Sequence, residues 1–196
     1  VCLENTHNIS GGVALSPRYM GQVADLAHRH DAAVFVDGAR LWNAAVAHGV
    51  SLSTMAGDVD AVSLSLNKGL GAPYGAMLCG SEELIRRSRQ NHRALGSHSV
   101  HKEGMFAAAA IVALETMIDR LAEDHENARA FCRDIAQIPG IKLLFDRCQT
   151  NLVFFDVSET GMDAATVSEH LLAHDVRIGA MGPYRMRAVT HLDVNA

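Results

Sequence analysis

The chain has 196 residues, of which 48% are hydrophobic and 20% charged, and its formal net charge is −5. This balance is typical of a globular protein with a substantial core, and it excludes fibrous and intrinsically disordered classes. The acidic balance and the lack of a long basic block argue against nucleic acid or an anionic membrane as a partner, and no apolar run is long enough to span a bilayer.

The first predicted elements are a strand over residues 1–5, a glycine-containing loop over 6–16 and a helix over 17–30. Ser16 is expected to cap this helix, with Pro17 in its first turn. Its apolar residues recur at helical spacing and are expected to pack on a sheet: Tyr19, Val23, Leu26 and Ala27. His7 and Asn8 are interpreted as local hydrogen-bonding residues of the loop, although a loop at a strand end could reach a ligand.

A short apolar segment that ends in Asp37 predicts the next strand, and residues 40–48 predict a helix that ends at Gly49. Taken alone, Asp37 could cap that helix, which is a common role for aspartate. Arg40 could likewise be a salt-bridged surface arginine. Both alternatives remain open at this point.

The apolar run of residues 60–66 predicts a strand buried on both faces, and Lys68 follows it at the start of a glycine-rich turn. Asp37 and Lys68 are 31 residues apart, which fits one βαβ unit, so parallel strands would bring both side chains to one sheet edge. Pyridoxal phosphate needs such a pair, because a lysine binds its aldehyde carbon and a carboxylate keeps its ring nitrogen protonated. The alternative is an ordinary lysine at a strand end.

After a strand at 75–80 and a helix that starts beyond Ser81, residues 104–136 predict one long alanine-rich helix. The last part predicts a small α+β unit with strands at 142–145, 152–156, 176–180 and 185–190 and a helix at 164–173. The sequence thus predicts an α/β fold in two domains. Residues 1–136 would form a mostly parallel sheet flanked by helices, and residues 137–196 a smaller α+β domain.

Four blocks together resemble the low-specificity L-threonine aldolase family, and they stand in the family's order: residues 4–8, 37–45, 66–75 and 187–194. The resemblance implies a fold-type I enzyme that uses pyridoxal 5'-phosphate to cleave L-threonine or L-allo-threonine into glycine and an aldehyde. It implies that Lys68 forms the Schiff base and that Asp37 binds the pyridine nitrogen. It further implies that Arg40 lies at the cofactor and, with Arg187, binds the substrate carboxylate.

The resemblance also implies a homo-oligomer, namely a dimer-based tetramer, and a fragment that lacks roughly the N-terminal third. The opening at Val1, without a start methionine, agrees with a fragment. The loop 96–104 departs from the family's pattern, and His101 or Lys102 is expected to replace a phosphate-binding arginine there. A metal site at His92, His98 and His101 is disfavoured, because no ordered carboxylates accompany them.

Alternatives to an aldolase are a β-eliminating lyase or aminotransferase of the same fold, and a non-catalytic fragment. An NAD-dependent enzyme is disfavoured, since no Gly-x-Gly-x-x-Gly turn follows a strand. The cysteines at positions 2, 79, 132 and 148 form no close pair and no metal-type spacing, so they are interpreted as ordinary small buried residues of a cytoplasmic protein.

Overall fold

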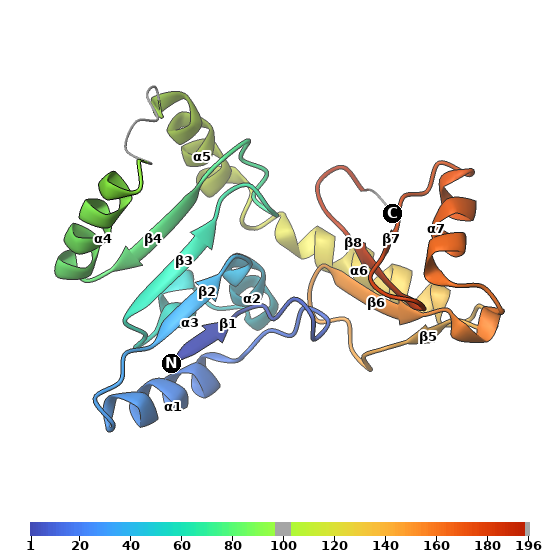
Figure 1. Ribbon diagram of the computed structural model, residues 1–196, viewed down its shortest axis with the longest axis horizontal. Coiled ribbons are helices and arrows are strands. Elements are labelled where there is room, and N and C mark those ends of the chain that lie inside the picture. Colours follow the sequence, from blue (N-terminus) through green and yellow to red (C-terminus); the bar gives the residue numbers. More distant parts are fainter. Residues whose placement is uncertain (97–102, 195–196) are drawn as a thin grey trace. The chain divides into compact units, whose positions relative to one another are not determined.

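The structure is a computed structural model that describes residues 1–96 and 103–194. The chain forms two compact units, each with its own four-stranded sheet (Figure 1). The first unit comprises Val1–Thr6 and Ala14–Leu121, and the second comprises His7–Val13 and Ala122–Ala196. No helix in the described part of the chain is both long and apolar enough to cross a membrane.

The sheet of the first unit has the strand order β1-β2-β3-β4. Its strands are β1 (Cys2–Glu4), β2 (Phe35–Gly38), β3 (Ala61–Ser65) and β4 (Ala76–Gly80). The first three strands are parallel, and β4 is antiparallel to β3. The predicted mostly parallel sheet is therefore confirmed, and the carboxyl ends of β1, β2 and β3 meet at one edge.

The helices of the first unit are α1 (Pro17–His28), α2 (Leu41–His48), α3 (Leu52–Ala56), α4 (Glu82–Ala94) and α5 (Gly104–Thr116). The bounds of α1 and α2 and the start of α4 agree closely with the prediction, whereas α3 was not predicted. Ser16 Oγ accepts a hydrogen bond of 3.2 Å from the Tyr19 amide, which caps α1. Gly49 ends α2 with a φ of 63°, a conformation that glycine adopts at little cost.

The core of the first unit lies between α1, α2 and the sheet, and it includes Val36 and Leu41, both fully buried. The predicted buried face of α1 was wrong in part, because Tyr19 and Leu26 are 48% and 52% exposed. Ala27 is buried as predicted, and Met20 and Ala24 are buried with it. These residues are four and three positions apart, so they form one continuous stripe along the helix. The stripe begins at Met20, one position after Tyr19.

The predicted single helix over residues 104–136 was wrong, since α5 ends at Thr116 and α6 (Leu121–Ile135) begins after a turn. Alanine content favours a continuous helix, but tertiary packing opposes it. Leu121 is fully buried in the core of the first unit, whereas Ala128 and Ile135 are buried in the core of the second. The helix therefore breaks where its packing partners change.

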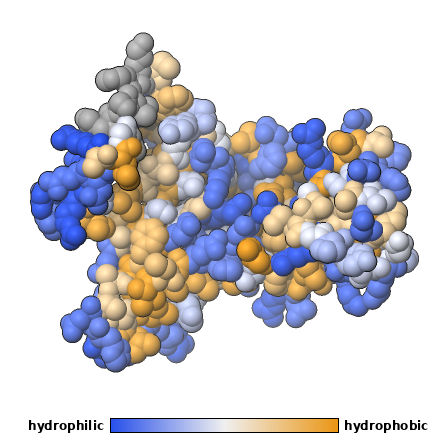
Figure 2. All heavy atoms as spheres, in the orientation of Figure 1, coloured by the Kyte–Doolittle hydropathy of each residue, from blue (hydrophilic) through white to orange (hydrophobic). Residues whose placement is uncertain are grey.

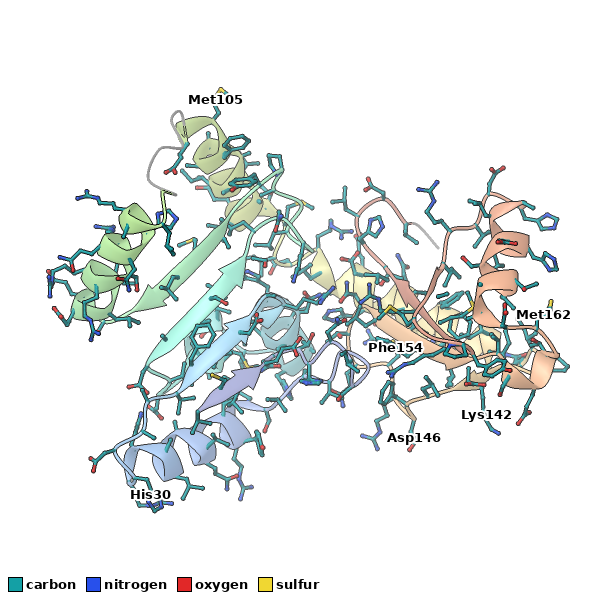
Figure 3. All side chains as sticks on the ribbon, in the orientation of Figure 1. His30, Met105, Lys142, Asp146, Phe154 and Met162 are labelled. Atoms are coloured by element: carbon teal, nitrogen blue, oxygen red, sulfur yellow. The ribbon has the colours of Figure 1, made fainter. Side chains whose placement is uncertain are left out.

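The second unit has an antiparallel sheet in the order β5-β6-β8-β7. Its elements after α6 are β5 (Lys142–Leu143), β6 (Leu152–Asp156), the 3-10 helix η2 (Ser158–Thr160), α7 (Ala164–Leu172), β7 (Gly179–Ala180) and β8 (Arg185–Val189). The α+β character is as predicted, although β5 and β7 are shorter. Phe154 on β6, labelled in Figure 3, packs edge-on against Phe145 with ring centroids 5.9 Å apart.

The division between the compact units differs from the predicted boundary after residue 136. It falls at Leu121, because α6 packs on the second sheet, where Ala128 and Ile135 contact a core that contains Phe155. Residues 7–13 also belong to the second unit, although they follow β1. Thr150 Oγ1 holds this loop by donating a hydrogen bond of 2.8 Å to the Gly12 carbonyl.

Candidate active site

Lys68 lies just beyond the carboxyl end of β3, in a turn that backbone hydrogen bonds close. The Leu66 amide donates to the Gly75 carbonyl at 3.0 Å, and the Leu66 carbonyl accepts from the Ala72 amide at 3.0 Å. Within the turn, the Gly71 amide donates to the Lys68 carbonyl at 2.9 Å. The lysine backbone is thus fixed at the sheet edge by main-chain contacts, as the apolar strand and the following glycines predict.

Glycine is required beside Lys68 for two different physical reasons. A Cβ atom on Gly69 would lie 2.7 Å from Leu121 Cδ2, so a side chain there would displace the buried side chain of Leu121. Gly71 has a φ of 72°, which is strained for any residue with a side chain. The glycine-rich turn therefore packs closely against the core while it presents Lys68.

Asp37 lies on β2 at the same edge of the sheet. In the parallel pairing it is directly opposite Glu4 on β1 and Ser63 on β3, so the three side chains share one sheet face. Asp37 Oδ1 accepts a hydrogen bond of 3.1 Å from the Ala39 amide. The alternative in which Asp37 caps the next helix is wrong, because α2 begins at Leu41 and Arg40 occupies its N-cap position.

Electrostatic interactions connect Lys68 with the other predicted residues of this unit. Burial is the largest effect and lowers the pKa of Lys68 below its usual value, and the positive charge of Arg40 lowers it further. The carboxylates of Asp37 and Glu4 oppose this shift and raise the pKa. Asp37 and Arg40 are therefore close enough to act electrostatically on Lys68, and Lys68 releases its proton more readily than a lysine in water.

Glu4 is a member of this cluster to which the sequence analysis assigned no role. The available signal was its place at the end of the first strand, next to Asp37 in a parallel sheet. That signal identifies Glu4 only once the pairing register of β1 and β2 is known, because the register puts Glu4 opposite Asp37. Together the two carboxylates balance the positive charges of Lys68 and Arg40.

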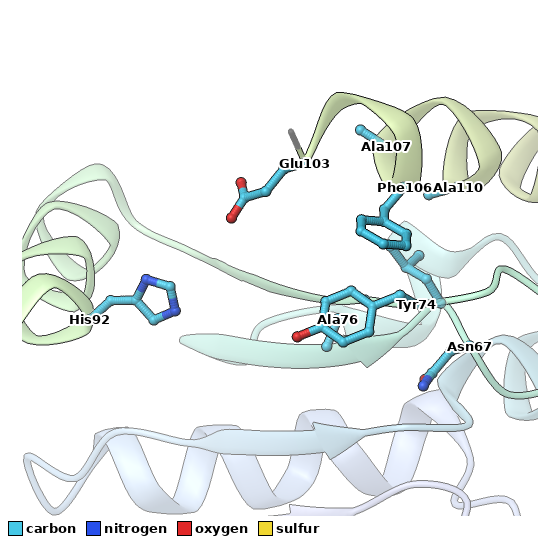
Figure 4. A pocket seen from close by; sticks show the side chains of 10 residues that line it. Asn67, Tyr74, Ala76, His92, Glu103, Phe106, Ala107 and Ala110 are labelled. Atoms are coloured by element: carbon cyan, nitrogen blue, oxygen red, sulfur yellow. The ribbon is translucent and has the colours of Figure 1, made fainter. Parts of the chain in front are cut away.

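A cavity of about 690 Å³ opens next to the lysine turn (Figure 4). Its walls include Leu66, Asn67, Tyr74, Gly75, Ala76, His92, Glu103, Phe106, Ala107 and Ala110. The rings of Tyr74 and Phe106 lie against each other, with centroids 5.2 Å apart. Among the residues described at this cavity, Asn67 is a wall residue and Lys68 is not, so the cavity adjoins the lysine cluster without containing it.

Arg187 lies in the second unit, on β8, and is thus in a different unit from Lys68. Its guanidinium donates a hydrogen bond of 3.1 Å to Asn8 Oδ1. Arg185, two residues earlier on the same sheet face, lies over the Phe154 ring at 4.6 Å from the centroid. Arg185 also donates a hydrogen bond of 2.6 Å to the Ile9 carbonyl, so both arginines bind the loop 7–13, and Arg185 in addition lies over an aromatic ring.

His7 takes part in the local hydrogen bonding that the sequence indicates, since its Nδ1 accepts a bond of 3.2 Å from the Ser10 amide. For Asn8 the local interpretation was incomplete, because its side chain accepts a hydrogen bond from the distant Arg187. The predicted replacement of a phosphate-binding arginine by His101 or Lys102 lies outside the described residues. His98 lies there as well.

A family model described as beta-eliminating lyase matches residues 1–160, which is most of the chain. The chain belongs to this family. The resemblance found in the sequence motifs is thereby confirmed at the level of the family, and the lysine cluster falls inside the matched region.

Curated relatives of the chain include low-specificity L-threonine aldolases from plants and bacteria. Aldolase 1 of Arabidopsis thaliana is 34% identical over 192 residues, which is 97% of this chain and 53% of the relative. The enzyme of Escherichia coli K12 is 36% identical over 193 residues, which is 98% of this chain and 55% of the relative. The chain therefore spans about half the length of the curated relatives it matches.

Solved structures support the fold. A protein from Exiguobacterium matches with a TM-score of 0.83 and 20% identity, over 97% of this chain and 55% of that one. A threonine aldolase of Leishmania major matches with a TM-score of 0.73 and 16% identity, over 100% of this chain and 56% of that one. At these identities the agreement concerns the fold, and it extends over both units.

Proposed function

We propose that the whole protein is a pyridoxal-phosphate-dependent aldolase that cleaves L-threonine, L-allo-threonine and related β-hydroxy-α-amino acids to glycine and an aldehyde. The observation that carries this proposal is the cluster of Lys68, Asp37 and Arg40 at the carboxyl edge of a mostly parallel sheet. Open α/β sheets bind ligands at this edge. The relatives are named low-specificity L-threonine aldolases, which supports the substrate class.

The donor set of the cluster fits pyridoxal phosphate. The aldehyde needs an amine that is readily deprotonated, and burial with Arg40 lowers the pKa of Lys68. The pyridine nitrogen needs a carboxylate, and Asp37 is exposed at the same edge of the sheet. When bound, the cofactor supplies an electron sink for the carbanion that forms when the bond between Cα and Cβ breaks.

Each side chain of the cluster has a separate task in this proposal. Lys68 Nζ would hold the cofactor covalently. Asp37 would keep the proton on the pyridine nitrogen, and its fixed position on β2 would orient the ring. Glu4 would add negative charge beside Asp37, which favours the protonated nitrogen further.

The substrate carboxylate calls for arginine, because the planar guanidinium donates two parallel hydrogen bonds to it. Arg40 is proposed for this role because it lies within electrostatic reach of Lys68. Arg187 is proposed as the second such arginine on the resemblance of its sequence block. Its hydrogen bond to Asn8 gives the guanidinium a defined orientation within the second unit.

A homo-oligomer is also proposed, and the exposed apolar side chains of the first unit support it. Met105, Ile111 and Val112 on α5 are 70%, 56% and 58% exposed. Figure 2 shows apolar surface over this part of the first unit. Light scattering on the full-length protein would measure the oligomeric state, and a monomer would contradict this part of the proposal.

The decisive experiment is to add pyridoxal phosphate to the full-length protein, reduce it with borohydride and locate the label by peptide mass spectrometry. The label is expected on Lys68, and Lys68→Ala should lose both the label and the visible absorbance. Lys142→Ala is the matched control, because Lys142 is an exposed lysine paired with Glu159 at 2.7 Å. Equal labelling of the wild type and Lys68→Ala would refute the assignment.

The alternative that deserves a direct test is another enzyme of the same family, since the family is described as beta-eliminating lyase. The product formed from threonine separates the two activities. Glycine and acetaldehyde are expected from an aldolase, whereas a keto acid and ammonia would result from elimination. Formation of the keto acid would refute the aldolase proposal and leave the role of Lys68 intact.

A further inference from the structure

Two cysteines far apart in the sequence lie together in the second unit. Cys132 is on α6 and Cys148 is in the segment before β6, and both line one cavity of about 550 Å³. Both are partly buried and pack against the core of this unit. The expectation of small buried cysteines was wrong for Cys2 and Cys79, which are exposed, and it did not include the proximity of Cys132 and Cys148.

The two thiols interact and are not equivalent. The interaction with Cys148 lowers the pKa of the Cys132 thiol, although burial opposes this shift. The same interaction and burial raise the pKa of Cys148, whose thiol donates a hydrogen bond of 3.3 Å to the Thr150 carbonyl. Cys132 is thus the better nucleophile, because the thiolate is the reactive form and Cys148 keeps its proton.

The cavity around the two thiols carries mostly positive charge. Arg129, Arg133 and Arg147 line it, and Asp146, which Figure 3 labels, is the acidic residue among its described lining. Arg129 also pairs with Glu126, while its charge still lowers the pKa of Cys148. Such surroundings favour a thiolate and an anionic reagent that approaches it.

We propose that Cys132 and Cys148 form a reversible redox pair that reacts with anionic low-molecular-weight disulfides, of which oxidised glutathione is the probe. The Cys132 thiolate attacks one sulfur of the reagent, whose disulfide bond breaks and releases one glutathione thiolate, which takes up a proton. Cys148 then loses its proton and attacks the Cys132 sulfur. A Cys132–Cys148 disulfide forms and the second glutathione leaves, so two thiols are oxidised while one disulfide is reduced.

A thiol-bound metal ion fits the site less well than a disulfide. In the chain outside 97–102 and 195–196, no group of three His, Cys, Asp or Glu side chains is placed to hold a metal ion. The redox pair is also independent of the proposed aldolase activity, because its two sulfurs and their surroundings all belong to the second unit.

The experiment treats the full-length protein with oxidised glutathione, blocks free thiols with iodoacetamide and maps tryptic peptides without reduction. Trypsin separates the two cysteines, since it cleaves after Arg129, Arg133 and Arg147, so a disulfide joins two peptides that are otherwise apart. The joined peptides are expected in the wild type and should disappear after dithiothreitol. Failure to find them while Cys2 or Cys79, both exposed, is modified would overturn the proposal.

Single variants test the order of the two steps. Cys148→Ser should trap one glutathione on Cys132, because the resolving thiol is absent. Cys132→Ser should leave Cys148 free of glutathione under the same conditions, and Cys79→Ser is the matched control that should still form the disulfide. Equal modification of Cys148 in Cys132→Ser would overturn the assigned roles, and circular dichroism establishes that each variant is folded.

Discussion

The buried histidine of α6 gives a quantitative prediction for stability against pH. His125 is only 2% exposed, and burial is the main reason that its pKa falls from 6.5 to about 4, with the charge of Arg129 as the second cause. The folded state therefore binds fewer protons than the unfolded state between these values. The contribution of neutral His125 to the free energy of unfolding is fully present above the pKa that this residue has in the unfolded state. It is lost as the pH falls toward the pKa that the residue has in the folded state.

The size of the effect follows from the two pKa values. The full difference of roughly 2.5 units corresponds to about 3 kcal/mol, and about 2 kcal/mol of it is lost by about pH 5. Urea unfolding followed by circular dichroism at about pH 7.5 and pH 5 measures this loss. Hydrogen exchange in peptides from α6 would locate it in the second unit.

His125→Gln removes the titrating group, so the free energy of unfolding of this variant should fall by about 2 kcal/mol less than that of the wild type between the two pH values. His174→Gln is the matched control, because His174 is an exposed histidine of the same unit. An equal loss of stability in the wild type and His125→Gln between the two pH values would refute the reasoning, whatever the absolute stability of the variant. An effect of the same size in His174→Gln would point to general charge effects instead.

Three further predictions concern the first unit and the loop 7–13. Arg40→Lys should raise the KM for threonine about 10- to 100-fold in the full-length enzyme, because one of two charge-assisted hydrogen bonds is lost; an unchanged KM in steady-state assays would remove Arg40 from substrate binding. Leu121→Ala should lower the free energy of unfolding by about 2–5 kcal/mol in urea titrations, since Leu121 is fully buried against Gly69; the exposed Leu172→Ala is its control, and equal losses would contradict the packing. Gly11→Ala should destabilise the loop, because its Cβ would lie 2.4 Å from Phe145 Cδ2 and its φ is 83°; hydrogen exchange of residues 7–13 that matches the wild type would contradict this.

Local sequence patterns predicted the parts of the fold that local chemistry determines. Short apolar runs with clear ends predicted β2 and β3, and their spacing predicted a parallel pair. That prediction was enough to place Asp37 and Lys68 at one sheet edge. Ser16, Gly49 and Ser81 likewise predicted helix ends, because a cap satisfies backbone groups within the same few residues.

The features that the sequence did not predict depend on distant partners. Nothing in an alanine-rich segment marks residue 117 as a break, because the break arises where Leu121 enters one core and Ala128 the other. Cys132 and Cys148 show no recognisable spacing, because α6 and the loop before β6 meet only in the folded unit. Glu4 joined the lysine cluster through strand register, which a single strand cannot reveal.

In the loop 7–13, the glycine pair was recognised in the sequence, but only its local consequence, a turn, was predicted. Gly11 and Gly12 predicted a turn, and both have positive φ values of 83° and 71°. Their second property is close contact, since a Cβ on Gly12 would lie 2.6 Å from Thr150 Oγ1 and one on Gly11 would meet Phe145. A glycine pair needed only for a turn tolerates a change of loop length, whereas one that packs closely against other residues of its own unit does not. Insertions after Asn8 are therefore expected to disturb Arg187, which donates its hydrogen bond to that residue.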